Sequence, residues 1–128
     1  MISAIINHLN LPIRNVRQST TFYRLALSPL GYRVIRDFSD DAAKLGPRNY
    51  ALLGLVHVEG DIRPLHFAFS ASDRATVRAC HQASLAAGAR DNGAPGLCPH
   101  YHEHYFAGFF FDPDGHNVEV VCHQPGDT

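Results

Sequence analysis

Polar and apolar positions in the first half of the chain follow strand and helix periods in turn. Residues 2–11 alternate with a period of two, which predicts a strand with His8 and Asn10 on one face. Asn15 is a predicted helix N-cap, and apolar residues follow it at helical spacing as far as Gly31. Three further strands are predicted between turn-forming residues, at 32–38, 42–45 and 50–58.

The second half shows the same succession of patterns. Residues 65–70 alternate cleanly, so His66 lies on the face opposite the large apolar side chains of that strand. Asp73 is a second predicted N-cap, before an alanine-rich helix over 74–87. The stretch 91–104 has no clear period and is predicted to be loosely structured. The last two strands are predicted at 105–111 and 116–123, joined by a tight turn at 112–115.

The spacing of the two halves indicates an internal repeat. His8 and His66 are 58 residues apart, and Asn15 and Asp73 have the same separation. Each half therefore has a strand histidine, then an N-cap, then a helix, and then further strands. The pattern predicts an α+β fold in which two tandem βαβββ modules, about 1–60 and about 61–128, form one domain over residues 1–128.

Composition and charge exclude several classes of protein. The chain has 128 residues, which suits one domain, and a formal net charge of −1 without a basic stripe, so we expect no nucleic-acid partner. Three cysteines without a CxxC pair favour reduced thiols, and no apolar run is long enough to span a membrane. We therefore expect a cytoplasmic protein without membrane contact. Only 18% of the residues are charged, which suggests that a second copy covers part of the surface and forms a homodimer.

Three residues with metal-binding side chains share the faces that point away from the best apolar stripes. They are His8, His66 and Glu119, each in the middle of a predicted strand. A carboxylate in mid-strand is costly to bury unless a cation or a partner neutralises it. Two imidazoles and one carboxylate suit a divalent ion such as Fe, Mn, Zn, Ni or Co. The alternative is that they are unrelated, with Glu119 paired to an arginine such as Arg14 or Arg33.

Three segments of the chain resemble the vicinal oxygen chelate superfamily. This superfamily includes glyoxalase I, bleomycin-resistance proteins, fosfomycin-resistance thiol transferases and extradiol dioxygenases. The segments are the run from His8 through Asn15 to Phe22-Tyr23, the strand start Pro64-Leu65-His66, and Phe111-Asp-Pro-Asp-Gly-His-Asn-Val-Glu119. The resemblance implies that the two modules curl into a cup around one divalent metal ion. It also implies that His8, His66 and Glu119 are the metal ligands, and that the substrate is a small molecule that chelates the ion through adjacent oxygens.

One departure from this pattern concerns the position that matches Glu119 in the first module. Glyoxalase I has a fourth ligand there, a glutamate, whereas this chain has Gly54. The resemblance therefore implies a site with three ligands, as in the dioxygenase and fosfomycin-resistance branches. It also implies weak or no conversion of the methylglyoxal–glutathione hemithioacetal, unless Glu59 or Glu103 takes the fourth position.

The stretch from His100 to Tyr105 is rich in imidazole and phenol groups. It directly precedes a predicted strand, and such side chains can orient a substrate or transfer protons. We predict catalytic roles for four of its residues: Tyr101, His102, Glu103 and His104. The alternative is a polar surface loop or a dimer contact.

Taken with the resemblance, these residues favour a metal-dependent enzyme, either a lyase or isomerase, a dioxygenase or a thiol transferase. The alternative is a protein of the bleomycin-resistance kind that sequesters a small molecule without catalysis. Retention of His8, His66 and Glu119 favours the enzyme, because a sequestering cup does not need metal ligands.

Overall fold

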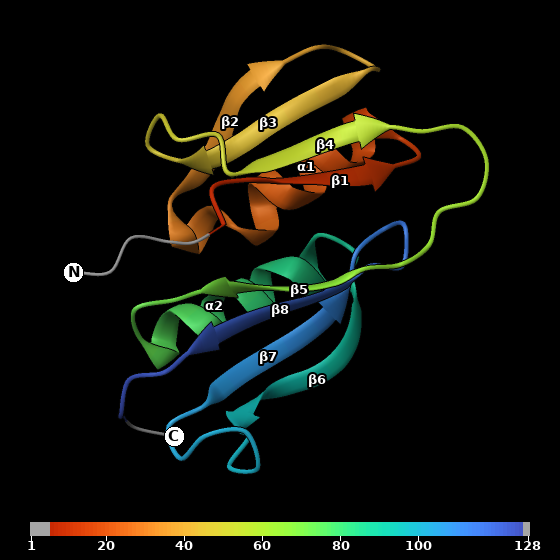
Figure 1. Ribbon diagram of the computed structural model, residues 1–128. Helices are drawn as coiled ribbons and strands as arrows, with labels where there is room; N and C mark the ends of the chain where they lie inside the picture. Colours follow the sequence, from red (N-terminus) through yellow and green to blue (C-terminus); the bar gives the residue numbers. More distant parts are fainter. Residues whose placement is uncertain (1–5, 127–128) are drawn as a thin grey trace.

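The computed structural model describes residues 6–126, which form two modules of the predicted βαβββ kind (Figure 1). In the first module β1 is parallel to β4, and the sheet order is β1-β4-β3-β2. Its elements are β1 (Leu9–Ile13), α1 (Val16–Ala26), the short 3₁₀ helix η1 (Ser28–Leu30), β2 (Tyr32–Asp37), β3 (Ala42–Pro47) and β4 (Leu53–His57). We call this four-stranded sheet the N-terminal sheet.

The second module repeats this topology, with β5 parallel to β8 and the order β5-β8-β7-β6. Its elements are β5 (His66–Ser70), α2 (Arg74–Ala86), β6 (Arg90–Leu97), β7 (Phe106–Phe111) and β8 (Asn117–Cys122). We call this sheet the C-terminal sheet. The predicted fold class and the tandem repeat are therefore confirmed.

Both predicted N-caps begin a helix. The side-chain oxygen of Asn15 accepts from the backbone N–H of Gln18 at 3.0 Å, and that of Asp73 accepts from Thr76 at 2.7 Å. These bonds satisfy N–H groups that the first turn of a helix leaves without a partner. The cap and the apolar stripe together explain why each helix begins where the sequence predicts.

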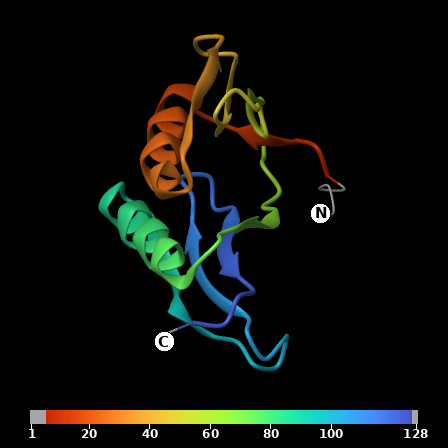
Figure 2. The same cartoon turned by 90° about the vertical axis from the view of Figure 1, so that its left-hand side faces the viewer.

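Both helices lie on the same side of the two sheets and contact each other (Figure 2). The buried apolar side chains of the strands point toward them and form one core shared by the modules, with Leu11 and Leu55 from the first and Phe110 and Val118 from the second. The opposite faces of the sheets carry no helix. We call these the open faces, and they are the faces on which Asn10 and His66 stand.

The junction between the modules is made of buried polar groups. The Tyr23 hydroxyl on α1 donates to Asp112 Oδ2, in the β7–β8 turn, at 2.6 Å. The ring of His116, which is fully buried, accepts from the backbone N–H of Leu65 at 3.0 Å and donates to the Pro12 carbonyl at 2.9 Å. The end of β1 therefore lies next to the start of β5, and these two strands run in opposite directions (Figure 1).

Two features differ from the sequence prediction. β1 begins at Leu9, so His8 precedes the strand and does not lie in its middle; residues 1–5 of the predicted strand lie outside the described residues. The sequence predicts a loose stretch over 91–104, but its first half, residues 91–97, belongs to β6, which pairs with β7. Two register shifts near Gly93 interrupt that pairing and remove the alternation by which a strand is recognised.

Among residues 6–126 no helix is long and apolar enough to cross a membrane.

We predict that Tyr23→Phe lowers the free energy of unfolding by about 2 kcal/mol, because it leaves a buried carboxylate oxygen of Asp112 without its donor. Urea denaturation followed by circular dichroism measures the change. Tyr32→Phe is the matched control, since the Tyr32 hydroxyl makes no hydrogen bond within the described part of the chain. Equal stability of the Tyr23 and Tyr32 variants would show that the Tyr23–Asp112 bond does not hold the modules together.

Candidate functional site

A buried carboxylate lies in the middle of the open face of the C-terminal sheet. Glu119 on β8 is only 3% exposed, and it stands opposite Ala68 on β5 and Phe109 on β7. Its neighbours Val118 and Val120 point the other way, into the core beneath α2. An ionised carboxylate in such a place must be compensated by charge or hydrogen bonds. Neither Arg14 nor Arg33, the alternative partners, forms an ion pair with it among residues 6–126.

His66 is the first of two partners of this carboxylate, and its ring is oriented by the backbone. Nδ1 lies 3.1 Å from the carbonyl oxygen of Asn117, so Nδ1 is the nitrogen that carries the proton of the neutral ring. Nε2 then presents a lone pair to Glu119 Oε1 at 3.2 Å. Two acceptors at this distance need a cation between them, which is either a second proton on the imidazole or a metal ion.

Tyr105 is the second partner. It immediately precedes β7, and its hydroxyl donates to Glu119 Oε2. Burial, followed by the neighbouring Glu119 carboxylate, raises the pKa of the Tyr105 phenol, so this group stays protonated and acts as a donor at neutral pH. The two oxygens of Glu119 thus have different partners, a phenol on one and an imidazole on the other.

Phe109 forms the apolar wall of this site. Its ring stacks on His66 with centroids 6.3 Å apart and an interplanar angle of 25°. Phe106 and Phe110 of the same strand are buried in the core, whereas Phe109 is partly exposed. The alternation of β7 could have identified it, because Phe109 shares a face with Tyr105 and stands opposite Glu119.

The spacing of the two donor atoms fits a shared divalent ion. Metal–nitrogen and metal–oxygen bonds of about 2.1 Å, at tetrahedral or octahedral angles, put neighbouring donor atoms about 3.0–3.5 Å apart. His66 Nε2 and Glu119 Oε1 are 3.2 Å apart. A metal-bound histidine also typically donates its other N–H to a carbonyl or carboxylate, as His66 does to Asn117. The chemistry of these two residues therefore fits a metal ligand pair.

The third predicted ligand, His8, is not near this pair within one chain. His66 opens β5 beside the end of β1, where His116 links Leu65 to Pro12. His8 lies before the start of β1, and a strand rise of about 3.3 Å per residue puts it roughly 13 Å from Pro12. Among the described residues, no three His, Cys, Asp or Glu side chains are grouped closely enough to hold one metal ion.

The position that matches Glu119 in the first module is occupied by Gly54, as the repeat predicts. Gly54 stands opposite Asn10 on β1 just as Glu119 stands opposite Ala68 on β5. A Cβ atom on residue 54 would lie 2.2 Å from Asn10 Oδ1, so the Asn10 carboxamide fills the space that a larger residue would need.

Neither alternative for the fourth ligand lies at that position. Glu59 pairs with His57 at 3.1 Å, and Glu103 lies 3.5 Å from His104.

The four residues predicted to be catalytic lie in the loop between β6 and β7. The backbone N–H of Cys98 donates to the Tyr105 carbonyl at 2.7 Å and closes this loop. The Tyr101 ring packs against Tyr105 with centroids 5.0 Å apart, which brings it beside the residue that bonds Glu119. The ring of His102 packs against those of His123, with centroids 5.7 Å apart, and His104, with centroids 6.1 Å apart.

Catalytic roles for Tyr101, His102, Glu103 and His104 remain a prediction. The residue of the His100–Tyr105 stretch that bonds Glu119 is Tyr105. A phenol directly before the start of a strand, on the face that alternation assigns to Phe109 opposite Glu119, is the feature of the sequence that identifies it.

A protein-family model for the glyoxalase/bleomycin resistance protein/dioxygenase superfamily matches residues 5–120. The chain belongs to this superfamily. The expected resemblance is therefore confirmed, and the match spans both modules. None of the curated proteins matches the chain.

Solved structures of this superfamily share the fold. A glyoxalase/bleomycin resistance protein from Albidiferax ferrireducens T118 has a TM-score of 0.78 at 19% identity, over 95% of this chain and 100% of its own. A glyoxalase-related enzyme from Fulvimarina pelagi has a TM-score of 0.71 at 18% identity, over 94% of this chain and 88% of its own. A glyoxalase I variant from Zea mays has a TM-score of 0.68 at 24% identity, over 91% of this chain and 46% of its own. At such identities these similarities show the fold alone.

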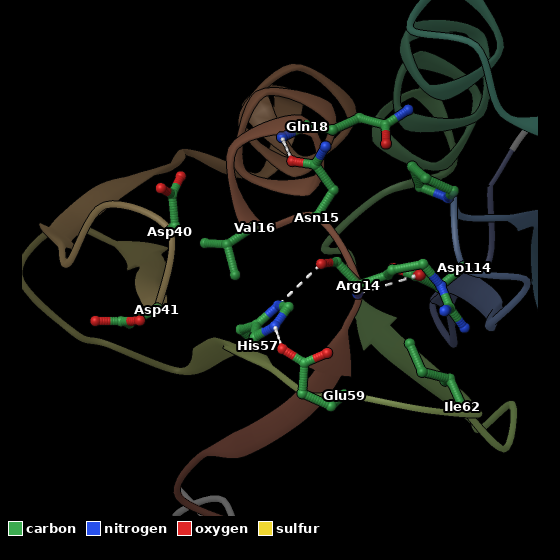
Figure 3. Close-up of a pocket in the computed structure, with 11 residues that line it drawn as sticks. Arg14, Asn15, Val16, Gln18, Asp40, Asp41, His57, Glu59, Ile62 and Asp114 are labelled. Atoms are coloured by element: carbon green, nitrogen blue, oxygen red, sulfur yellow. Dashed lines mark hydrogen bonds and ion pairs between the residues drawn. The ribbon is translucent and has the colours of Figure 1, made fainter.

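This superfamily member also has a cavity of about 810 Å³ away from Glu119, at the ends of β1 and β4 (Figure 3). His57 lies in it with Nδ1 at 2.9 Å from the Arg14 carbonyl and Nε2 at 3.1 Å from Glu59 Oε1. The carboxylate of Asp114 accepts from the Arg14 backbone N–H at 3.2 Å. The other carboxylate oxygen of Asp114, Oδ2, is buried and has no hydrogen-bond partner among the described residues.

The His57–Glu59 pair predicts a pH dependence. The hydrogen bond to Glu59, followed by that to the Arg14 carbonyl, raises the pKa of His57 above its ordinary value of about 6.5. Because the folded-state pKa is the higher one, the pair stabilises the fold at low pH, and this contribution disappears as the pH rises through the folded-state pKa. NMR titration of the His57 ring should show a raised midpoint that falls in Glu59→Gln and is unchanged in Glu103→Gln. If the titration midpoint of His57 is unchanged in Glu59→Gln, the His57–Glu59 pairing is wrong.

Proposed function

We propose that the protein is a metal-dependent enzyme that acts on a small molecule with two adjacent oxygens. The observation that carries this proposal is the 3.2 Å spacing of His66 Nε2 and Glu119 Oε1, with the other nitrogen of His66 held by the Asn117 carbonyl. Membership of the superfamily supports it. In this proposal His66, Glu119 and His8 hold one divalent ion of Fe, Mn, Zn, Ni or Co, and Gly54 supplies no fourth protein ligand.

Each residue of the site has a separate task in this proposal. The metal supplies Lewis-acid chemistry, which polarises bound oxygens and stabilises negative charge on them. The Asn117 carbonyl fixes the ring of His66, and the Tyr105 hydroxyl fixes the second oxygen of Glu119. The ring of Phe109 shields one face of His66 from water. Tyr101, which packs beside Tyr105, contacts the substrate in this proposal.

The third ligand comes from a second copy of the chain in this proposal. His8 is too far from His66 in the same chain, and the helices cover the same side of both sheets, so the open faces remain available (Figure 2). A two-fold axis between two copies would set the N-terminal sheet of each against the C-terminal sheet of the other, and both cups would form at once. Val56, an apolar residue on the open face that is 38% exposed, would be covered by such a homodimer.

We predict that the dimer binds one divalent ion per chain and that His66→Ala, Glu119→Ala and His8→Ala each weaken binding by about 100-fold, because each removes one ligand. Calorimetric titration and elemental analysis of the purified protein measure the affinity and the stoichiometry. His100→Ala is the matched control, since it removes an exposed imidazole that contacts only Tyr101 among the described residues. If the His66→Ala variant still binds one ion per chain, the assignment of His66 as a metal ligand is wrong.

A mixing experiment tests whether the ligands come from two chains. We predict that His8→Ala and Glu119→Ala homodimers, each defective in metal binding, regain about one tight site for every two dimers after they are unfolded together in equal amounts and refolded, because random association makes about half of the dimers mixed. In the mixed dimer one cup contains both substitutions and the other contains none. Sedimentation measures the dimer, and calorimetry counts the sites.

Two results would contradict parts of this proposal. Monomers at micromolar concentration, or no recovery of metal sites after mixing, would show that the cup is not shared between chains. Tight binding of a small molecule that does not depend on His66 or Glu119 would favour the alternative, a sequestering protein without metal chemistry.

A further inference from the structure

The open face of the N-terminal sheet carries a row of polar side chains, which come from three of its four strands. Arg36 on β2 stands opposite Lys44 on β3, Lys44 stands opposite Gly54 on β4, and Gly54 stands opposite Asn10 on β1. Residues directly opposite each other in neighbouring strands share a face, so these side chains project together. Arg36, Lys44 and Asn10 are all exposed. We call these three residues the basic row.

The two cations of the basic row have no carboxylate partner in the part of the chain that the structure describes. Arg36 and Lys44 form no ion pair with any residue between 6 and 126. Arg33, on the same face opposite Gly46, bonds only the neutral side chain of Asn49, at 2.6 Å. The nearby Asp37 stands opposite the buried Ala43, and so belongs to the other face, where it accepts from the Ser39 backbone N–H.

Like charges placed opposite each other on a sheet repel, so the pair of Arg36 and Lys44 has a cost that the fold itself does not recover. An anion between them would remove this repulsion and receive charge-assisted hydrogen bonds.

Asn10 extends the row toward the proposed metal centre. Because Gly54 has no side chain, the Asn10 carboxamide lies over β4, with Oδ1 2.2 Å from the place that a Cβ of residue 54 would take. The carboxamide is therefore directed from β1 toward the strand of Lys44. His8, the proposed ligand, precedes Asn10 by two residues.

We propose that the basic row binds an acid group of the substrate, so that the substrate has two adjacent oxygens for the metal and a separate carboxylate or phosphate for Arg36 and Lys44. This inference rests on the proposed function, because it places the open face of the N-terminal sheet inside the cup. Neighbouring strands are about 4.8 Å apart, which puts the backbone of Lys44 about 10 Å from that of Asn10. The long Lys44 side chain shortens that span, so the acid group lies several bonds from the chelating oxygens.

Two matched compounds test the inference by calorimetry on the Mn²⁺-loaded protein. 2-Oxoadipate and 2-oxohexanoate have the same adjacent oxygens and the same number of carbons, but only the first has a distal carboxylate. We expect 2-oxoadipate to bind about tenfold tighter or more. In R36Q/K44Q this preference should disappear while the affinity for 2-oxohexanoate is unchanged. R24Q/R63Q is the control for charge, because it removes two exposed arginines outside the row.

Several outcomes would overturn the inference. The first is that the wild type binds the two compounds with equal affinity, or binds neither. The second is that the preference for 2-oxoadipate persists in R36Q/K44Q. The third is that R36Q/K44Q dissociates into monomers and still retains the preference. The last would show that the row contacts the partner subunit and not the substrate.

A failure of the proposed function can be distinguished from a failure of this inference. If His66→Ala leaves binding of 2-oxohexanoate and of Mn²⁺ unchanged, the metal centre is wrong, even where the acid preference of the basic row is observed.

Discussion

The buried carboxylate of Glu119 is the constraint on which the open face of the C-terminal sheet depends. Its position in β8, between Val118 and Val120 of the core, leaves it no freedom to reach solvent, and it is 3% exposed. Burying such a charge without compensation is very unfavourable. The compensation comes from the start of the neighbouring strands: His66 opens β5, and Tyr105 immediately precedes β7. The same carboxylate is therefore both the structural reason for this arrangement of side chains and the feature that makes it suitable for a cation.

Local features of the chain account for most of what the sequence predicts correctly. Alternation with a period of two separates Glu119 from the core residues beside it, and the caps Asn15 and Asp73 are correct because they act within one helical turn. The separation of 58 residues between His8 and His66 reflects the repeated topology, and that topology explains why Gly54 matches Glu119 in the two sheets. These predictions need no knowledge of how the two modules are placed relative to each other.

The features that the sequence does not predict all depend on long-range placement. The sequence does not predict β6, because Gly93 and Gly96 lie at register shifts that interrupt the alternation of polar and apolar residues. Pairing with β7 keeps this strand in the sheet. The bond from Tyr105 to Glu119 joins residues that alternation places on one face, but only the pairing of β7 with β8 brings them together. The separation of His8 from His66 follows from the antiparallel placement of β1 and β5, which is fixed by the buried His116 ring and by Tyr23 and Asp112.

The two modules have the same strand arrangement, but the polar residues at matched positions of their open faces differ. In the C-terminal sheet the large polar residue, Glu119, is on β8 and the small one, Ala68, is opposite it on β5. In the N-terminal sheet the small residue, Gly54, is on β4, and the large polar one, Asn10, is on β1. Because the large residue is on β1 and not on β4, a neutral amide lies over Gly54, where the C-terminal sheet has the carboxylate of Glu119. Lys44, opposite Gly54 on β3, makes this face basic. The two open faces therefore differ in chemistry: one has a buried carboxylate that already has an imidazole and a phenol as partners, and the other has two cations without a carboxylate partner among residues 6–126.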